Sequence, residues 1–370
     1  MTPRLEAFLR FFSRRDQRNP FSAWQIELTT RCPLACKMCI RRENDAWQNQ
    51  DMPFEAFKKL LPHLKEVETV ILEGWGESLL YPRLTECVRL IKREGPQVGF
   101  VTSGKGLKQG RVSELVEAGL DFVGFSVAGT TPETHAAIRV NSHLSEVIEG
   151  VRLFDEERTR QGTPGPKVHL VFLMLKDNIG EIPGIPALAR EMGIKEVFLT
   201  NICHAINAWQ EEQKIFTWDR EKNKYEKTIE EVEVQAKKLG IKVKRPSLVA
   251  ADVAVCEENP LRNLYISAEG EVSPCVYLHP PLPSPFKRIF CGREHWIEKL
   301  SFGNAFQVPF STIWDQASYM ELRSRFVERD KKSRELFLSL LDGAKPGAHQ
   351  QEAFPEPPDP CKSCHKILGL

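Results

Sequence analysis

Short apolar runs alternate with amphipathic stretches between about residues 20 and 200 of the chain. The apolar runs are rich in β-branched and aromatic residues, as buried strands are. The stretches between them, such as FEAFKKLLPHL and YPRLTECVRLIKRE, repeat apolar residues every three or four positions, which is the helical period. This pattern predicts strands over residues 23–29, 69–74, 98–103, 122–127, 167–175 and 196–200.

Repeated strand–helix alternation predicts an α/β fold built from βαβ units around a parallel sheet. An open doubly wound sheet and a closed or partial barrel would both give this pattern. In either architecture, functional groups collect on the loops at the C-terminal ends of the strands. Polar side chains follow five successive predicted strands, so we expect the site at that rim.

The pattern changes after a long charged helical stretch that leads to IKVKRP, near residue 245. Beyond that point the chain is richer in Pro and turn residues, and it contains the predicted hairpin YISAEGEVSPC. We therefore expect an N-terminal helix over residues 1–19, an α/β domain over 20–245 and a small α+β domain over 246–370.

The charge of the chain is balanced, with 51 Lys and Arg residues against 50 Asp and Glu residues. Such a balance gives no basic footprint for nucleic acid. No apolar run reaches the length of a membrane span, and the N-terminal segment lacks the apolar core of a signal peptide. The sequence therefore predicts a cytoplasmic protein that neither binds nucleic acid nor spans a membrane.

Seven of the ten cysteines fall into three close groups. Without a secretion signal, such spacing indicates metal ligation rather than disulfides. Cys32, Cys36 and Cys39 form a C-x3-C-x2-C group directly after the first predicted strand. Three thiolates on one loop can hold three corners of a [4Fe–4S] cluster and leave one iron open. A structural zinc ion, the alternative, would need a fourth ligand.

The other paired cysteines lie in the C-terminal region. Cys256 and Cys275 flank the predicted hairpin, and Cys361 and Cys364 form a C-x2-C pair. Together they supply four thiolates, which suit either a structural zinc ion or an iron–sulfur cluster. Spacing alone does not choose between the two metals.

The segment TRCPLACKMCI resembles the radical S-adenosylmethionine (SAM) superfamily, whose C-x3-C-x2-C loop follows the first strand of a partial β/α barrel. This resemblance covers about residues 20–245 and implies a partial (β/α)6 TIM-like barrel. EGWGES (73–78) is similar to the family's Gly-Gly-Glu-Pro segment, which holds the amino group of SAM. Glu77 aligns with the acid, whereas Trp75 and Ser78 depart from the usual Gly and Pro.

Other positions resemble further SAM contacts of the family. Ser103, in TSG, replaces the Asn of Thr-Asn-Gly, and Ser126 resembles the serine that reaches the SAM ribose or carboxylate. Arg139 resembles the arginine that pairs with the carboxylate, a task suited to a bidentate donor. Met38 stands where many members have an aromatic residue beside the adenine. The resemblance implies SAM contacts from Met38, Gly74, Trp75, Gly76, Glu77, Ser103, Ser126, Arg139 and Asn178.

The C-terminal region resembles the auxiliary-cluster domains of the SPASM/Twitch group, through the G-x4-C that ends at Cys275, FGN (302–304), residues 311–326 and the final C-x2-C. A full SPASM domain holds two clusters and needs more cysteines than the chain has after Cys364. The resemblance therefore implies the shorter Twitch type. Its one auxiliary [4Fe–4S] cluster would be held by Cys256, Cys275, Cys361 and Cys364.

Two further residues near these cysteines are candidates of a weaker kind. Cys291, in IFCGRE, is either a spare thiol or a ligand in place of one of the four cysteines. His365 adjoins the C-x2-C pair, and we expect it to be a bystander.

The resemblance also implies a chemistry. A reduced cluster cleaves SAM to a 5′-deoxyadenosyl radical, which takes hydrogen from a substrate inside the barrel, and the auxiliary cluster accepts an electron. The implied cofactors are SAM and two [4Fe–4S] clusters, and the electron donor would be a ferredoxin or flavodoxin. We expect a peptide or protein substrate, for which a separate peptide-recognition protein would be needed.

Two alternatives remain at this stage. The same chemistry could act on a small alcohol or a cofactor precursor, such as that of a tungsten cofactor. The chain could instead be a non-catalytic iron–sulfur or zinc scaffold, which would neither bind SAM nor need Glu77.

Overall fold

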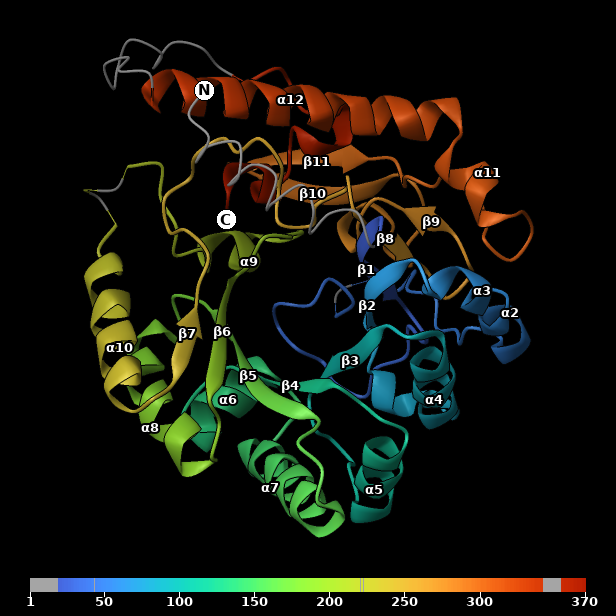
Figure 1. The fold of residues 1–370 in the computed structure, drawn as a ribbon. Helices are drawn as coiled ribbons and strands as arrows, with labels where there is room; N and C mark the ends of the chain where they lie inside the picture. The colour runs from blue at the N-terminus through green and yellow to red at the C-terminus, as the bar shows by residue number, and fades with distance from the viewer. Residues whose placement is uncertain (1–18, 43, 220, 222, 342–353) are drawn as a thin grey trace.

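The computed structural model describes residues 19–42, 44–219, 221, 223–341 and 354–370 (Figure 1). The helix predicted over residues 1–19 therefore lies, except for its last residue, outside the described part of the chain. The six predicted strands of the α/β domain are all present. They are β1 (Phe21–Ile26), β2 (Val67–Ile71), β3 (Gln97–Thr102), β4 (Phe122–Val127), β5 (Lys167–Met174) and β6 (Glu196–Asn201).

These strands pair in chain order, and every neighbouring pair is parallel. A seventh strand, β7 (Lys242–Lys244), pairs parallel with β6 and comes from the IKVKRP segment that we expected at the domain boundary. The strands curve into an arc that does not close, with the loop after β1 reaching into its centre (Figure 1). The predicted partial barrel is thus confirmed, with one strand more than expected.

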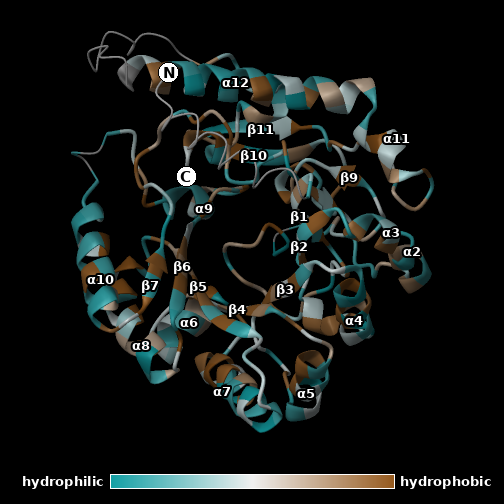
Figure 2. Ribbon diagram, in the orientation of Figure 1, coloured by the Kyte–Doolittle hydropathy of each residue, from teal (hydrophilic) through white to brown (hydrophobic). Residues whose placement is uncertain are grey.

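Helices cover the outside of the arc, as right-handed βαβ units require. Figure 2 shows their apolar residues turned toward the strands. The outer helices are α4 (Leu84–Glu94), α5 (Gln109–Glu117), α7 (Leu144–Gln161), α8 (Ile185–Glu191) and α10 (Glu226–Lys238). Shorter helices, α2 (Phe54–Lys58), α3 (Leu61–Leu64), α6 (Pro132–Ile138) and α9 (Ala208–Glu212), lie in the loops.

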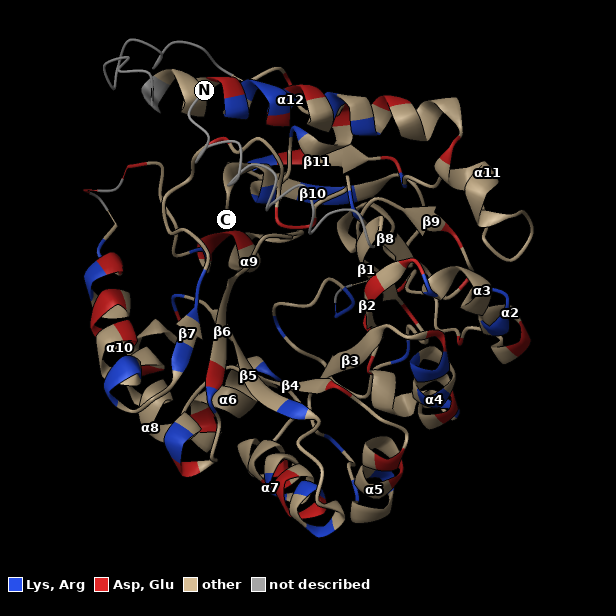
Figure 3. Ribbon diagram, viewed as in Figure 1, with Lys and Arg blue, Asp and Glu red and all other residues tan. Residues whose placement is uncertain are grey.

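The surface of these helices is mixed in charge, since Figure 3 shows residues of both signs along α7 and α10. Among the described helices, none combines the length and the apolar character that crossing a bilayer requires.

The C-terminal region joins the barrel through its sheet. β8 (Asn263–Ile266) pairs parallel with β1 on the side opposite to β2, and β9 (Val272–Ser273) completes the predicted hairpin. The sheet thus runs in the order β7-β6-β5-β4-β3-β2-β1-β8-β9. The domain boundaries stay a prediction, but the sheet continues across residue 246.

Two further layers lie beyond this sheet (Figure 1). β10 (Phe286–Phe290) and β11 (Arg293–Ile297) form a separate antiparallel hairpin. The short α11 (Phe310–Trp314) and the long α12 (Ala317–Leu341) follow, and α12 runs across the hairpin.

A fully buried arginine on α12 fastens the segment before Cys256. Arg329 is 0% exposed; its Nε donates to the Ala254 carbonyl at 3.1 Å and its Nη2 to the Val253 carbonyl at 2.7 Å. Nη2 also forms an ion pair with Asp252. Arg329 thereby ties α12 to the chain that leads into the second cysteine group.

Replacing this side chain should destabilise the fold. We expect Arg329→Ala to lower the free energy of unfolding by about 3 kcal/mol, because it removes a fully buried side chain and leaves partly buried carbonyls without their donor. Urea unfolding of the metal-free protein measures this change. The matched control is Arg325→Ala on the exposed side of α12, which should change stability by no more than about 0.5 kcal/mol. Equal effects of the two substitutions would contradict this account.

Candidate active site

The first cysteine group lies on the loop after β1, at the C-terminal end of the barrel. Cys36 is 7% exposed, and Cys32 and Cys39 are partly buried. Burial raises the pKa of Cys32 to about 12 and raises that of Cys39, and the neighbouring Cys36 adds to both shifts. Metal ligands must be deprotonated, so these buried thiols need a positively charged group to become thiolates. An iron–sulfur cluster fits this donor set.

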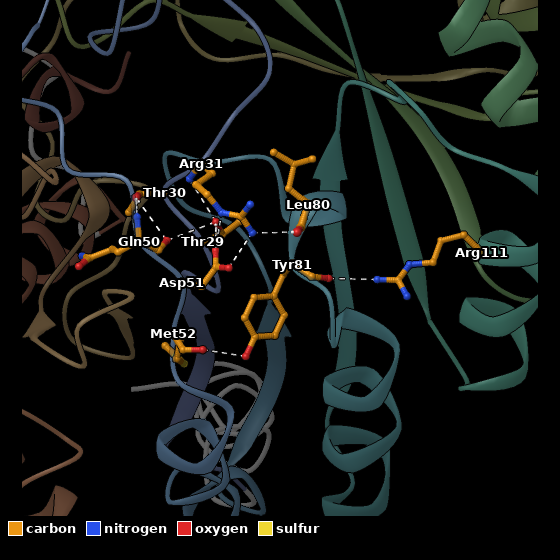
Figure 4. A network of polar contacts seen from close by, with 9 residues as sticks. All are labelled: Thr29, Thr30, Arg31, Gln50, Asp51, Met52, Leu80, Tyr81 and Arg111. Atoms are coloured by element: carbon orange, nitrogen blue, oxygen red, sulfur yellow. Dashed lines mark hydrogen bonds and ion pairs between the residues drawn. The ribbon is translucent and has the colours of Figure 1, made fainter.

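An arginine–aspartate pair holds one side of this loop (Figure 4). Arg31, which directly precedes Cys32, binds both oxygens of Asp51, with Nε–Oδ1 at 2.9 Å and Nη2–Oδ2 at 2.6 Å. Nη2 also donates to the Leu80 carbonyl at 3.1 Å, and the Thr29 hydroxyl donates to Asp51 at 2.6 Å. The bidentate pair thus joins the start of the cysteine loop to its return and to the loop after β2.

The other side of the cysteine loop lies beside Arg139. The backbone N–H groups of Ala35 and Lys37 donate to the carbonyls of Val140 and Ile138, which flank Arg139, at 3.0 and 2.9 Å. The Arg139 charge opposes the rise in the pKa of Cys39. Its buried Nε has no hydrogen-bond partner among the described residues. An orphaned guanidinium donor next to the cluster loop fits the predicted role of binding the SAM carboxylate.

Glu77 connects three loops at this end of the barrel. The residue is 5% exposed, and its Oε1 accepts the Thr102 hydroxyl at 2.7 Å. Its Oε2 accepts both the backbone N–H (2.9 Å) and the hydroxyl (2.8 Å) of Ser103. The Glu77 N–H donates to the Arg31 carbonyl at 2.8 Å. Two predicted site residues, Glu77 and Ser103, are therefore in direct contact.

The two glycines around Trp75 are required by close packing against the strand end. A Cβ on Gly74 would lie 2.3 Å from Glu27 Oε1, and one on Gly76 would lie 2.1 Å from the Thr29 carbonyl oxygen. No side chain fits at these distances. The GWG segment can therefore pack this closely only because positions 74 and 76 are both glycine.

Glu27 is a site residue that sequence analysis missed. It is 1% exposed at the end of β1, where Oε1 accepts the Trp75 N–H at 2.6 Å and Oε2 accepts the Tyr265 hydroxyl at 2.7 Å. Burial raises the pKa of Glu27 to about 7, against the lowering effect of these hydrogen bonds. The sequence did contain a signal for Glu27, because an acidic residue at an inward position of the predicted strand 23–29 is unusual.

Asn178, another predicted SAM contact, lies where the strands β4 and β5 end. Asn178 is 1% exposed, and its side-chain amide is hydrogen-bonded within the protein. Its Nδ2 donates to the carbonyls of Ala128 and Leu173, and its Oδ1 accepts the Leu175 N–H. The structure thus shows Asn178 joining the ends of β4 and β5. Its contact with SAM stays a prediction.

Ser126 and Met38 lie on β4 and on the cysteine loop, respectively. Ser126 is partly buried in β4, and its hydroxyl makes no hydrogen bond to the described residues. Met38 packs against a small apolar cluster that includes Ala128 and Ile202. The contacts of both residues with SAM stay a prediction.

The second cysteine group comes together from distant parts of the chain. Burial raises the pKa of Cys256 to about 12 and also raises those of Cys275 and Cys361, and the thiols add to one another's shifts. Cys364 acts on all three. Four partly buried thiols whose charges act on one another fit an auxiliary iron–sulfur cluster. Across the described residues, no three Cys, His, Asp or Glu side chains are close enough to surround one metal ion, whereas a [4Fe–4S] cluster takes each thiolate on a different iron.

Cys291 and His365 have other surroundings. Cys291 is exposed in the turn between β10 and β11, and the charges that act on its thiol are those of Lys214, Glu211 and Arg293. His365 is 2% exposed, with Nδ1 3.2 Å from the Cys203 carbonyl oxygen and Nε2 3.2 Å from the Lys214 amine. Both nitrogens of His365 are thus engaged within the protein.

The Arg31–Asp51 pair should govern how firmly the first cluster is held. We expect Asp51→Asn to make the reconstituted protein lose iron to a chelator about tenfold faster, because outer residues that orient metal ligands carry effects of this size. The matched control is Asp45→Asn, an exposed aspartate on the same loop. Identical rates of iron loss from the two variants would refute a role for the pair.

Glu27 should give the stability a defined pH dependence. Its pKa is 4.5 in the unfolded reference and about 7 when folded. Between these values the folded protein keeps a proton that the unfolded chain has lost, so stability falls as pH rises, by about 3 kcal/mol at pH 7.

Glu27→Gln should therefore flatten this profile in urea unfolding of the metal-free protein at pH 5, 6 and 7. Some slope should remain, because burial raises the pKa of Glu73 to about 7 as well. Parallel wild-type and Glu27→Gln profiles would contradict the assignment.

Comparison with known families agrees with this geometry. The model described as the radical SAM superfamily matches residues 26–186, which span the first cysteine group and the strands β2 to β5. The model described as an iron–sulfur cluster-binding domain, SPASM, matches residues 256–337. The latter match ends before Cys361, so the number of auxiliary clusters stays a prediction.

Two relatives differ in how much of the chain they cover. A tungsten-containing aldehyde ferredoxin oxidoreductase cofactor-modifying protein of Pyrococcus furiosus is 25% identical over 305 residues, which cover 80% of this chain and 82% of that protein. A PqqA peptide cyclase of Streptomyces rochei is 29% identical over 180 residues, which cover 48% of this chain and 47% of the cyclase. The second match thus spans about half of each protein.

Solved structures share the fold at low sequence identity. Streptococcus suis SuiB bound to S-adenosylmethionine superposes with a TM-score of 0.63 at 14% identity, over 86% of this chain and 72% of SuiB. The two family matches cover the first cysteine group and, of the second, Cys256 and Cys275. The alternative of a non-catalytic scaffold is wrong, because the radical SAM match and the relatives named as a cofactor-modifying protein and a peptide cyclase indicate an enzyme. The chain belongs to the radical SAM superfamily and is a radical SAM enzyme with a C-terminal SPASM domain, whose cofactors are SAM and iron–sulfur clusters.

Proposed function

We propose that this enzyme abstracts hydrogen from a peptide or protein substrate and completes an oxidative modification with the help of one auxiliary [4Fe–4S] cluster. The bound cofactors would supply a 5′-deoxyadenosyl radical at the first cluster and an electron acceptor at the second. The protein's own residues bind these groups, orient them and exclude water.

Different residues would bind the cluster, hold the surrounding loops and bind SAM. Cys32, Cys36 and Cys39 would hold the first cluster. The Glu77 carboxylate fixes the loops after β2 and β3 on either side of it, and Arg139 offers a free donor for the SAM carboxylate. Because these groups are already positioned by internal contacts, little reorganisation is needed when SAM binds.

One observation carries the proposal. One pocket is lined by residues of both regions, and among them are Gly74 and Trp75 of the predicted SAM-binding loop. Glu258, two residues after Cys256, and Tyr277, two residues after Cys275, line the same pocket. A substrate in this pocket would lie beside the predicted SAM-binding loop and beside the segments that carry Cys256 and Cys275.

Similar proteins support a peptide substrate. The PqqA peptide cyclases of Streptomyces rochei and Ruegeria pomeroyi match about half of this chain. SuiB has also been solved bound to its precursor peptide SuiA. The likeness to SuiB concerns the fold alone, so the substrate class rests mainly on the cyclases and on the pocket.

A cofactor precursor is the second candidate. The Pyrococcus furiosus relative, a cofactor-modifying protein, matches 80% of this chain, which is a longer match than either cyclase gives. Both candidates use the same first step and differ only in the molecule that fills the pocket.

The cluster assignment is tested by iron content and SAM cleavage after anaerobic reconstitution. We expect about eight iron atoms per chain, and about four in a Cys32/Cys36/Cys39→Ala variant. Under dithionite, 5′-deoxyadenosine should form with the parent protein and not with this variant. A Cys256/Cys275/Cys361/Cys364→Ala variant should also hold about four irons but still cleave SAM. Zinc in place of iron, or iron without SAM cleavage, would refute the proposal.

The substrate class is tested with the same holoenzyme. We would supply it with two fractions of a deuterated cell extract, one of peptides and one of small metabolites, and measure deuterium in 5′-deoxyadenosine. Label from the peptide fraction is the expected result. Label from the small-molecule fraction alone would favour the cofactor precursor.

A further inference from the structure

A buried histidine lies one helical turn before Arg139. His135 belongs to α6 and is 0% exposed. The Arg139 N–H donates to the His135 carbonyl at 2.8 Å, and the Ser142 N–H donates to the Arg139 carbonyl at 2.8 Å. Arg139 therefore stands where α6 ends and a turn begins, and both backbone hydrogen bonds hold it there.

The ring of His135 joins the end of β4 to this turn. Its Nδ1 accepts the N–H of Ala128, the residue after β4, at 3.4 Å, and its Nε2 lies 3.0 Å from the Ser142 hydroxyl oxygen. Burial lowers the pKa of His135 to about 4, and the Arg139 charge adds to this shift. The ring is therefore neutral near pH 7. A neutral ring that accepts at Nδ1 carries its proton on Nε2, so His135 donates to Ser142.

The helix that carries His135 depends on such contacts. α6 has seven residues, and a helix of this length is not stable by itself in water. Its start is held by Glu181, which accepts the Thr130 N–H at 2.6 Å and the Thr131 hydroxyl at 2.8 Å. Its end is held from inside by the His135 ring, which reaches both β4 and the turn.

The position of Arg139 matters because its side chain keeps a donor in reserve. The buried Nε of Arg139 has no hydrogen-bond partner among the described residues. Ordering a long side chain on binding costs conformational entropy, and a backbone that is already fixed reduces what remains to be ordered. A residue that fixes the Arg139 backbone therefore strengthens the binding of whatever accepts from this guanidinium.

We infer that His135 is a positioning residue for SAM: by joining the end of β4 to Ser142, it fixes the backbone from which Arg139 reaches the SAM carboxylate. The inference rests on the proposed function, because the assignment of Arg139 to SAM comes from there. A histidine that only stabilises the fold would act on SAM binding whether or not Arg139 is present. A positioning residue acts only while Arg139 is present.

A double-mutant cycle on SAM affinity separates these two roles. The affinity is measured by anaerobic titration calorimetry of the reconstituted enzyme without reductant, and each titration is referred to the iron content of the same sample. His135→Leu and Arg139→Ala should each weaken SAM binding about tenfold, which is about 1.4 kcal/mol. The double variant should bind SAM within about twofold of Arg139→Ala, because coupled residues are not additive.

Two milder substitutions keep the test independent of the folding of His135→Leu. Ser142→Ala removes one hydrogen bond of the ring and should weaken SAM binding about threefold, again only while Arg139 is present. His135→Gln can place an amide donor near the position of Nε2 and should retain most of the affinity. The matched control is His169→Leu, which replaces a partly buried histidine of β5 whose pKa is also lowered to about 4 by burial. It should leave SAM affinity unchanged.

Additive effects in the double variant would overturn the inference. So would SAM affinity that is undiminished in both His135→Leu and Ser142→Ala. If either result appears while Arg139→Ala weakens SAM binding, only the role of His135 is refuted. If Arg139→Ala leaves SAM affinity unchanged, the assignment of Arg139 in the proposed function is refuted as well. The substrate class is tested separately, by deuterium transfer, and none of these titrations bears on it.

Discussion

The hydrogen bonds of Glu77 are the constraint on which the active site depends. One buried carboxylate accepts three hydrogen bonds from Thr102 and Ser103, while its own N–H reaches back to Arg31. The loops after β1, β2 and β3 therefore cannot move independently. Arg31 extends this connection to Asp51 and so fixes the cysteine loop from both ends. The geometry of the cluster loop thus follows from contacts made outside the cysteines.

Glu27 connects the barrel to the C-terminal region, much as Glu77 connects the loops at the end of the barrel. It binds the Trp75 N–H on the barrel side and the Tyr265 hydroxyl of β8 on the C-terminal side. Since β8 also pairs with β1, the auxiliary region is attached to the barrel by backbone and side chain together. The two cysteine-bearing regions are consequently held in one framework, and residues of both line one pocket.

The sequence predicted this architecture where local patterns decide it. Strand–helix alternation identified the six barrel strands, and the spacing of Cys32, Cys36 and Cys39 identified the first cluster loop. β7 was missed because its three residues, KVK, carry no apolar run. The pairing of β8 with β1 was missed because it joins residues about 240 positions apart. No periodicity records such a contact. Glu27 was missed for a related reason: an acid in a predicted strand is visible in the sequence, but its partners, Trp75 and Tyr265, lie far from it along the chain.

Electrostatics gives the two cysteine groups a common property. Burial raises the pKa of Cys39 and of Cys361, and neighbouring thiols add to both shifts. Arginines oppose the rise in each group, since Arg139 acts on Cys39 and Arg329 acts on Cys361. Arg329 therefore has an electrostatic role besides its hydrogen bonds to the segment before Cys256. Because these arginines only oppose the effect of burial, the thiols still need the positive charge of bound iron to become thiolates.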